Sequence, residues 1–229
     1  MGDMFALVSW SGGKDSCLAL HRARTRLGLK VELLVTAMDE TGQRARSHGV
    51  PPALLSRQAF SLGVKEIKFY HASWEEYEAK FVTMLQCAKV DSGITEAVFG
   101  DIDIASHREW EEKVCSLAGL NCHLPLWNED RLAIVNEFLT EGFRAIVVCV
   151  DGSVLPQSFC GREFDESFVK DLPPGVDPCG ENGEFHTFAY AGPAFVNGPV
   201  ALTRVEIKTY ESPAEYGGKT FYFQILDVI

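Results

Sequence analysis

The sequence predicts an α/β fold in which a mostly parallel β-sheet carries helices on both faces. Short apolar runs alternate with segments of helical periodicity through the first two thirds of the 229-residue chain. Near residue 150 this alternation gives way to a stretch rich in Gly and Pro, which two β-rich runs follow. Alternating strands and helices are typical of parallel sheets, because each crossover between parallel strands needs a long connection. Ligands of such sheets bind at the carboxyl ends of the strands.

Five runs rich in Val, Ile, Leu or Phe have the length and composition of strands. They are residues 5–10, 31–37, 65–70, 96–100 and 144–150. Five further segments have helical periodicity, at 14–27, 52–62, 75–90, 107–119 and 129–141. Pro51 and Pro52 suit the start of the second helix, because the first turn leaves its N–H groups unpaired, and Asn128 is the expected cap of the fifth.

The last third of the chain has a different texture. Residues 151–194 are expected to form an ordered loop region with a short helix near 165–171. The runs 199–210 and 219–228 flank a turn signal at 215–218, so we expect an antiparallel hairpin there. An exposed edge of this hairpin could pair with a second subunit, which leaves a homo-oligomer open.

Composition and charge narrow the class of protein. The chain is 46% apolar and carries a formal net charge of −11, as in an acidic globular enzyme. Such a charge does not favour nucleic acid or an anionic membrane as a partner, and we expect Arg22, Arg24 and Arg26 on a solvated helix face. No apolar run reaches the roughly 18 residues that cross a bilayer, and the N-terminus lacks the features of a signal peptide. We therefore expect a cytoplasmic protein.

The cysteines do not indicate a disulfide framework or a zinc site. Their number is odd, no CxxC pair occurs, and several lie within apolar strand or helix patterns. They are Cys17, Cys87, Cys115, Cys122, Cys149, Cys160 and Cys179. Buried thiols are the expected state.

The run SGGKDS directly follows the first strand and opens the first helix. Glycines let the backbone approach an anion, and the N–H groups of a helix N-terminus point at it, so this run predicts a phosphate cradle. The spacing does not fit the Walker pattern, and it resembles the PP-loop, SGGxDS, of N-type ATP pyrophosphatases. That resemblance implies cleavage of ATP between the α and β phosphates; the alternative is a glycine turn without a ligand. The expected ATP-binding residues are Ser11, Gly12, Gly13, Lys14, Asp15 and Ser16.

A second dense group of polar residues lies in the run CGENGEFHTF, residues 179–188. Glu181 and Glu184 could bind an ammonium ion or Mg²⁺, Asn182 could bind a carbonyl group, and His186 could relay protons. The alternative is a polar turn that leads into a strand, since Gly, Asn and Glu are common turn residues.

The pairing of SGGKDSC with GENGEFHTF resembles the diphthine–ammonia ligase family, which has an ATP-binding diphthamide synthetase domain. The resemblance extends over nearly the whole chain and includes 47–48, 100–101, 114–115 and 124–127. It implies a Rossmann-like (HUP-type) ATP-binding domain and a smaller C-terminal α+β substrate domain. With a boundary placed near residue 125, these domains cover 1–125 and 126–229.

The family resemblance implies a ligase that adenylates the carboxylate of diphthine on elongation factor 2 and lets ammonia displace AMP. Lys14 and Asp15 would then act on ATP, with Asp15 as the Mg²⁺ ligand, and Glu181 and Glu184 would guide and deprotonate ammonium. The expected substrate-side residues are His48, Asp101, Asn182 and His186. For His48 the alternative is a loop histidine with a purely structural hydrogen bond.

The segment 101–110 departs from the family pattern, because it is longer and differently charged than the usual short Tyr-Gln-Arg type sequence. A different acceptor, such as a small carboxylic acid, is therefore one alternative. A PP-loop tRNA-modifying enzyme is another, although it would need paired cysteines and a basic surface. A nucleotide-binding sensor without ligase activity is the third.

Overall fold

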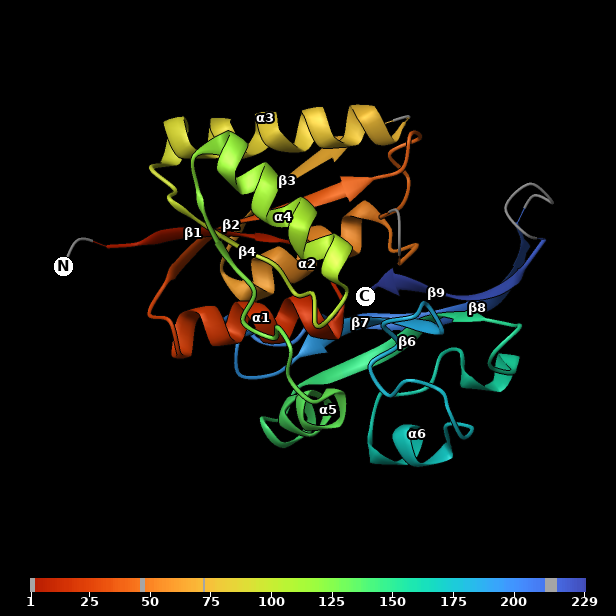
Figure 1. Ribbon diagram of the computed structural model, residues 1–229. Helices are drawn as coiled ribbons and strands as arrows, with labels where there is room; N and C mark the ends of the chain where they lie inside the picture. Colours follow the sequence, from red (N-terminus) through yellow and green to blue (C-terminus); the bar gives the residue numbers. More distant parts are fainter. Residues whose placement is uncertain (1–2, 46–47, 72, 213–217) are drawn as a thin grey trace.

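The computed structural model describes residues 3–45, 48–71, 73–212 and 218–229. These residues form two sheets (Figure 1). The first has the strand order β3-β2-β1-β4-β5, and all its pairs are parallel. Its strands are β1 (Phe5–Ser9), β2 (Lys30–Met38), β3 (Lys65–Tyr70), β4 (Glu96–Val98) and β5 (Asn121–His123).

Helices cover both faces of this parallel sheet, as the sequence predicts. On one face, α3 (Trp74–Ser92) and α4 (Ala105–Ala118) share an apolar cluster with the strands, which includes Leu7 and Leu33. On the other face lie α1 (Lys14–Thr25) and α2 (Pro52–Leu62) (Figure 1). Pro51 precedes α2 as its N-cap residue and Pro52 opens the helix, in agreement with the sequence prediction.

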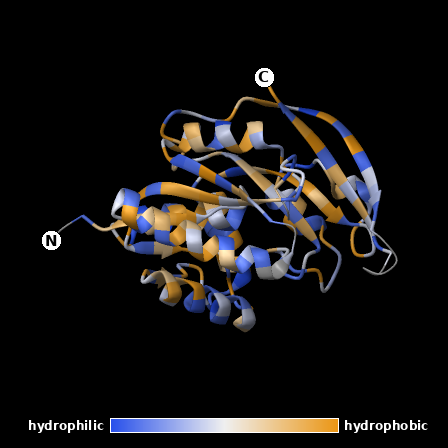
Figure 2. Cartoon of the chain, turned by 90° about the horizontal axis from the view of Figure 1, so that it is seen from above, coloured by the Kyte–Doolittle hydropathy of each residue, from blue (hydrophilic) through white to orange (hydrophobic). Residues whose placement is uncertain are grey.

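The second sheet is antiparallel and has the order β7-β6-β9-β8. Its strands are β6 (Arg144–Asp151), β7 (Phe185–Ala191), β8 (Leu202–Glu211) and β9 (Thr220–Val228). The helix α5 (Arg131–Thr140), a 3₁₀ turn (Gln157–Phe159) and the short helix α6 (Glu166–Asp171) complete this part. The predicted β8–β9 hairpin is confirmed, and apolar and polar residues alternate along it (Figure 2). Of its predicted turn, residues 215–217 lie outside the described residues.

The two sheets enclose α1 and α2 between them. Helix α1 contacts β1 and β2 on one side and β7 on the other, while α2 contacts β3 and β9. Val8, Leu18 and Val147 therefore belong to one apolar cluster, although they lie on the first sheet, on α1 and on the second sheet. The core is continuous across both parts of the chain.

Three strand predictions need correction. The run 144–150 forms β6, but β6 lies in the antiparallel sheet and does not continue the parallel one. Its partners β7 and β9 are far away in sequence, so local periodicity carries no information about the pairing. Strand β5 was missed because it has only three residues. The loop region expected at 151–194 contains β7, so the alternative of a polar turn that leads into a strand describes the run 179–188.

The start of α5 also differs from the prediction. Its N-cap is Asp130, whose side chain accepts a hydrogen bond of 2.8 Å from the N–H of Ala133. Asn128 instead has a φ of 57° in the turn before the helix, and its N–H donates to the carbonyl of Ile102 at 2.6 Å. Asn tolerates this left-handed conformation better than most residues, which explains its place in the turn.

Arg22 does not lie on a solvated face, contrary to the prediction, because its side chain faces α5 and the segment before that helix. Its side chain is 2% exposed and pairs with Glu129 at 2.7 Å and with Glu137 at 2.6 Å.

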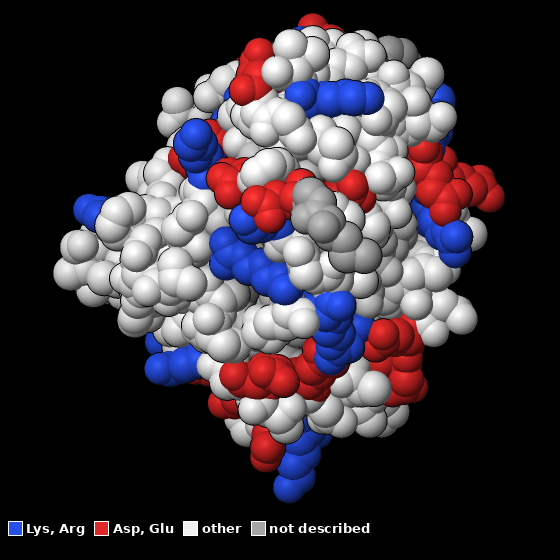
Figure 3. All heavy atoms as spheres, turned by 90° about the vertical axis from the view of Figure 1, so that its left-hand side faces the viewer, with Lys and Arg blue, Asp and Glu red and all other residues white. Residues whose placement is uncertain are grey.

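On the face at the amino ends of the parallel strands, acidic and basic side chains are intermixed (Figure 3). All seven cysteines are free, and the expectation of buried thiols is confirmed for five of them.

Candidate active site

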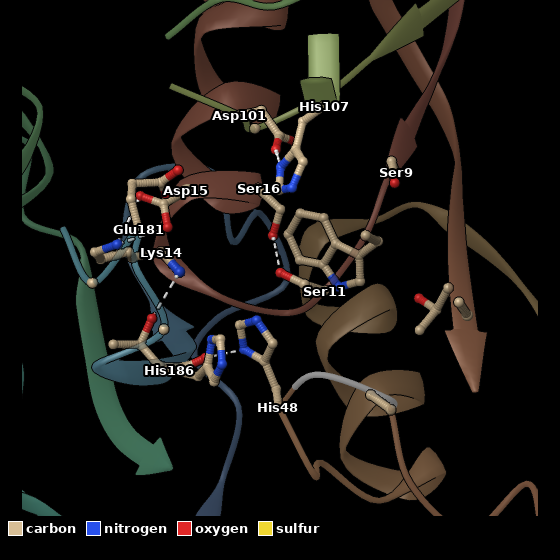
Figure 4. A pocket seen from close by; sticks show the side chains of 18 of the residues that line it. Ser9, Ser11, Lys14, Asp15, Ser16, His48, Asp101, His107, Glu181 and His186 are labelled. Carbon is tan, nitrogen blue, oxygen red and sulfur yellow. Dashed lines mark hydrogen bonds and ion pairs between the residues drawn. The ribbon is translucent and has the colours of Figure 1, made fainter. Parts of the chain in front are cut away.

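A cavity of about 460 Å³ lies at the carboxyl ends of β1, β2 and β4. The loop after β1, the start of the β4–α4 connection and the loop that precedes β7 meet there (Figure 4). Of the residues that the sequence singles out, the following line the cavity: Ser11, Lys14, Asp15, Ser16, His48, Asp101, Glu181 and His186. Gly12, Gly13, Asn182 and Glu184 are not among the lining residues.

The loop 11–16 is held in the shape of a helix N-terminus that opens on the cavity. Gly12 has a φ of 84°, a conformation that other residues rarely adopt, and its carbonyl accepts a hydrogen bond of 2.9 Å from Gln58. Gly13 is the N-cap and provides no side-chain cap to the first turn of α1. The Oγ atoms of Ser11 and Ser16 lie 3.2 Å apart beside it. This geometry suits an anion, because the N–H groups of a helix start and its dipole favour negative charge.

Gly100 lets the end of β4 approach the start of α1. A Cβ atom at this position would lie 2.9 Å from the backbone N of Ser16 and 3.0 Å from the carbonyl carbon of Asp15. Only glycine fits this contact, and the contact brings the next residue, Asp101, to the cavity wall near Asp15.

Lys14 is a buried cation at the centre of the site. Its side chain is 4% exposed, and its Nζ lies 2.7 Å from Oδ2 of Asp15 and donates to the carbonyl of Cys179. Burial alone would lower the pKa of Lys14, but Asp15, Cys179 and Glu181 outweigh burial and raise the pKa. Burial raises the pKa of Asp15, against the pull of Lys14. Lys14 therefore remains charged and is oriented by its partners.

Glu181 and Glu184 lie in very different surroundings. Burial, together with Asp15 and Asp101, raises the pKa of Glu181 to about 7. Glu184 is 6% exposed and accepts hydrogen bonds from the backbone N of Asn182 at 3.1 Å and from its Nδ2 at 3.0 Å. Glu181 faces the cavity with a pKa suited to proton transfer, whereas Glu184 holds the loop from the inside.

His48 and His186 lie side by side at the cavity wall, with ring centroids 4.7 Å apart (Figure 4). Nδ1 of His48 donates a hydrogen bond of 2.8 Å to the carbonyl of Thr187. Burial is the main cause that lowers the pKa of His48 to about 4 and that of His186 to about 3. Both rings are therefore neutral near pH 7, and a neutral imidazole has one nitrogen that can donate and one that can accept a hydrogen bond.

Asp101 has two partners on α4 that the sequence analysis missed. Nδ1 of His107 donates to Asp101 at 2.6 Å, and the buried Glu111 faces the same carboxylate. Burial and Asp101 raise the pKa of Glu111 to about 11, so Glu111 is protonated near neutral pH. The spacing of 107 and 111 places both side chains on one face of a helix, which is the signal that could have found them.

The cavity also has an aromatic part, which the sequence analysis missed and which we call the aromatic lobe; His71, Tyr77 and Phe81 line it. Tyr77 stacks on Phe81 with centroids 5.9 Å apart, and His71 contacts Tyr77 edge-on. Oγ1 of Thr36, a side chain that is 1% exposed on the cavity wall, has no hydrogen-bond partner among the described residues. A buried hydroxyl without a partner is costly, so this lobe suits a ligand that combines an apolar ring with a hydrogen-bonding group.

The described residues do not form a complete metal site by themselves, because no group of three or more His, Cys, Asp or Glu side chains lies close enough together. Mg²⁺ is usually held by one or two carboxylates together with phosphate oxygens. Asp15 lines the cavity from the first turn of α1 and could supply one such carboxylate to Mg²⁺ that arrives with a nucleotide.

Two family models match most of the chain. The model of the diphthamide synthase N-terminal domain matches residues 4–122, and the model of the diphthamide synthase C-terminal domain matches residues 130–225. The chain belongs to the diphthamide synthase family. In this family member, Lys14 lies in the N-terminal matched region and Glu181 in the C-terminal one, so both regions contribute to the cavity. Our division at residue 125 remains a prediction, since both parts share one core.

Two proteins named diphthine–ammonia ligase are similar to this chain. The chain is 26% identical over 225 residues to a diphthine–ammonia ligase of Schizosaccharomyces pombe, a match that covers 88% of this chain and 36% of the relative. It is 33% identical over 89 residues to a diphthine–ammonia ligase of Danio rerio, which covers 37% of this chain and 35% of the relative. The matches thus span about a third of the length of these relatives.

A solved structure described as a predicted subunit of a tRNA methyltransferase from Methanocaldococcus jannaschii gives a TM-score of 0.42 at 19% identity. The alignment covers 63% of this chain and 80% of that one.

In the described part of the chain, every helix is too short or too polar to cross a bilayer.

Proposed function

We propose that this protein is an ATP-dependent amide ligase that adenylates a carboxylate and amidates it with ammonia, releasing AMP and pyrophosphate. The family relationship makes diphthine on elongation factor 2 the proposed acceptor and the cytoplasm the proposed location. The observation that carries the proposal is the meeting of two groups in one cavity: a helix N-terminus with the buried cation Lys14, and Glu181 with a pKa of about 7.

On the ATP side, the loop 11–16 would hold the phosphates and Lys14 would stabilise the charge that develops as the α–β bond breaks. The aromatic lobe would take the nucleoside, and Thr36 would gain the hydrogen-bond partner that it lacks. Asp15 would hold Mg²⁺, which would neutralise phosphate charge. Gly12 and Gly13 would act through the shape of the loop, since they do not line the cavity.

On the acceptor side, Glu181 would remove a proton from ammonium, whose nitrogen has no free lone pair until it is deprotonated. The nitrogen would then attack the acyl carbon, and the bond from that carbon to the AMP oxygen would break. Asp101 adds negative charge that favours ammonium, and the neutral His48 and His186 would offer hydrogen bonds to the acceptor. Glu184 and Asn182 would act by holding the loop that carries Glu181.

Two of the alternatives conflict with the cavity. Cys179 lines it, but burial raises the pKa of this thiol to about 12, which makes it a poor nucleophile for a thiolation reaction. A sensor that only binds nucleotide would gain nothing from a carboxylate poised near pH 7 beside the phosphate cradle. A small carboxylic acid as the acceptor is the second candidate, favoured by the unusual segment 101–110, whose Asp101 and His107 line the cavity.

Phosphorus NMR of ATP, Mg²⁺ and ammonium tests the proposal, in the presence and absence of elongation factor 2 that carries diphthine. We expect AMP and pyrophosphate only with that acceptor, and none with Lys14→Ala, whose folding is checked by circular dichroism. Turnover with a panel of small carboxylic acids, but not with the factor, would favour the second candidate. ADP as the product would contradict adenylation.

A further inference from the structure

Arg131 joins two loops that belong to different parts of the chain. It is the first residue of α5. Its guanidinium donates two hydrogen bonds to Asp103, from Nε to Oδ2 at 2.8 Å and from Nη2 to Oδ1 at 2.6 Å. The remaining nitrogen, Nη1, lies 2.8 Å from Oδ2 of Asp177. Asp103 follows β4, whereas Asp177 belongs to the loop before β7. A cation at a helix N-terminus opposes the helix dipole, so the ion pairs must account for its position.

Asp177 connects Arg131 to two residues that line the cavity, Cys179 and Glu181. It is buried, its Oδ1 accepts the N–H of Cys179 at 3.0 Å, and its Oδ2 accepts the N–H of Glu181 at 2.7 Å. Cys179 in turn offers its carbonyl to Lys14, and its Sγ donates to the carbonyl of Arg131 at 3.2 Å. The loop that carries Glu181 is thereby tied to α5 through both the side chain and the backbone of Arg131.

We propose that Arg131 is a positioning residue of the active site, which fixes the loop 177–181 so that Glu181 and the Cys179 carbonyl face Lys14. Arg131 does not line the cavity and therefore acts through Asp177. Its planar fork suits the bidentate contact with Asp103, which a lysine cannot reproduce. The segment that departs from the family pattern thus helps to place the loop with the proposed base. The effect on turnover rests on the proposed function; the effect on the loop does not.

Amide hydrogen exchange of the whole chain tests the loop directly. In Arg131→Gln, we expect the amides of Cys179 and Glu181 to exchange at least about tenfold faster, while amides of β6 keep their protection. Arg162→Gln is the matched control, because Arg162 is 27% exposed against 26% for Arg131 and pairs with Asp171 at 2.8 Å. Equal exchange of the Cys179 and Glu181 amides in both variants would overturn the proposal.

Kinetics with ATP and diphthine-bearing elongation factor 2 give the second readout. We expect Arg131→Gln to lower kcat by about tenfold to a hundredfold with a KM for ATP within about twofold, because small displacements of a catalytic group are costly. Arg131→Lys should lose less kcat than Arg131→Gln. When Asp103→Asn is added to Arg131→Gln, it should lower kcat little further, because both substitutions break the same contact between Arg131 and Asp103. Full additivity, or a KM effect alone, would contradict the bridge. Inactivity of the unchanged protein with this factor would refute diphthine as the acceptor and leave the exchange result to decide this inference.

Discussion

At the scale of single residues, Glu181 and Glu184 show how two carboxylates three positions apart take different roles. If Glu181 is the base, as we propose, its pKa of about 7 predicts a rate of AMP formation that rises with pH around neutrality, because only the ionised carboxylate can accept a proton. Glu181→Gln should abolish this rise and lower kcat by about a hundredfold or more. Glu184→Gln should lower kcat but keep the rise, because it loosens the loop without removing the base. Initial rates of AMP formation between pH 5.5 and 9 measure this rise. If only Glu184→Gln abolished it, Glu184 and not Glu181 would be the base.

Glu111 predicts an unusual pH dependence of stability. Its pKa is raised from 4.5 to about 11 by burial and by Asp101, so folding must keep it protonated. The free energy of unfolding that depends on Glu111 is therefore largest below about pH 4.5 and falls as the pH rises towards 11. Glu111→Gln mimics the neutral acid, so its stability relative to the unchanged protein should increase between pH 6 and 8, by at most about 1.4 kcal/mol per pH unit.

Urea unfolding at several pH values measures this difference, and Glu112→Gln serves as the control. Glu112 is the next residue on α4, is 50% exposed and pairs with Arg108. Its replacement should leave the pH dependence unchanged. A constant difference between Glu111→Gln and the unchanged protein across this range would show that Glu111 is ionised in the folded state.

At the scale of elements, α1 links the glycine turn of residues 11–16 to α5. The buried Arg22 pairs with Glu137, which is 18% exposed, and with Glu129, which is 42% exposed. Arg22→Met should lower the free energy of unfolding by about 2–4 kcal/mol, because it leaves Glu137 without its buried partner. Arg26 binds the same Glu137 at 2.6 Å but is 52% exposed, so Arg26→Met should change stability by less than about 1 kcal/mol. Equal effects in urea unfolding would show that burial of Arg22 adds nothing.

The same elements show which features the sequence can predict. The glycine turn of 11–16 and the start of α2 at Pro52 depend on local rules, and the structure contains both. The family resemblance rests on motif residues, and the family models confirm it. The pairing of β6, the burial of Arg22 and the contact of Arg131 with Asp177 depend on residues distant in sequence. No local pattern encodes such contacts, so they required the three-dimensional structure.

At the scale of the whole molecule, the enclosed position of α1 and α2 ties the two parts of the chain together. Leu18 and Leu55 are fully buried in a cluster that also contains Val147 and Phe188 of the second sheet. Without the second sheet, one side of both helices would face water. Each Å² of apolar surface that becomes exposed costs about 25 cal/mol. Exposing one side of two helices is therefore costly against the free energy of unfolding of most domains, which is only about 5–15 kcal/mol.

We therefore predict that residues 1–125 do not fold cooperatively by themselves. The fragment should bind a hydrophobic dye and lack a sharp urea transition, whereas the whole chain should unfold in one transition seen alike by far-UV circular dichroism and tryptophan fluorescence. Adding residues 126–229 as a separate fragment should restore the transition, because it supplies β6, β7 and β9 to the exposed helices. A cooperative transition of 1–125 alone would show that the parallel sheet and its outer helices suffice, and that the shared core adds stability without deciding the fold.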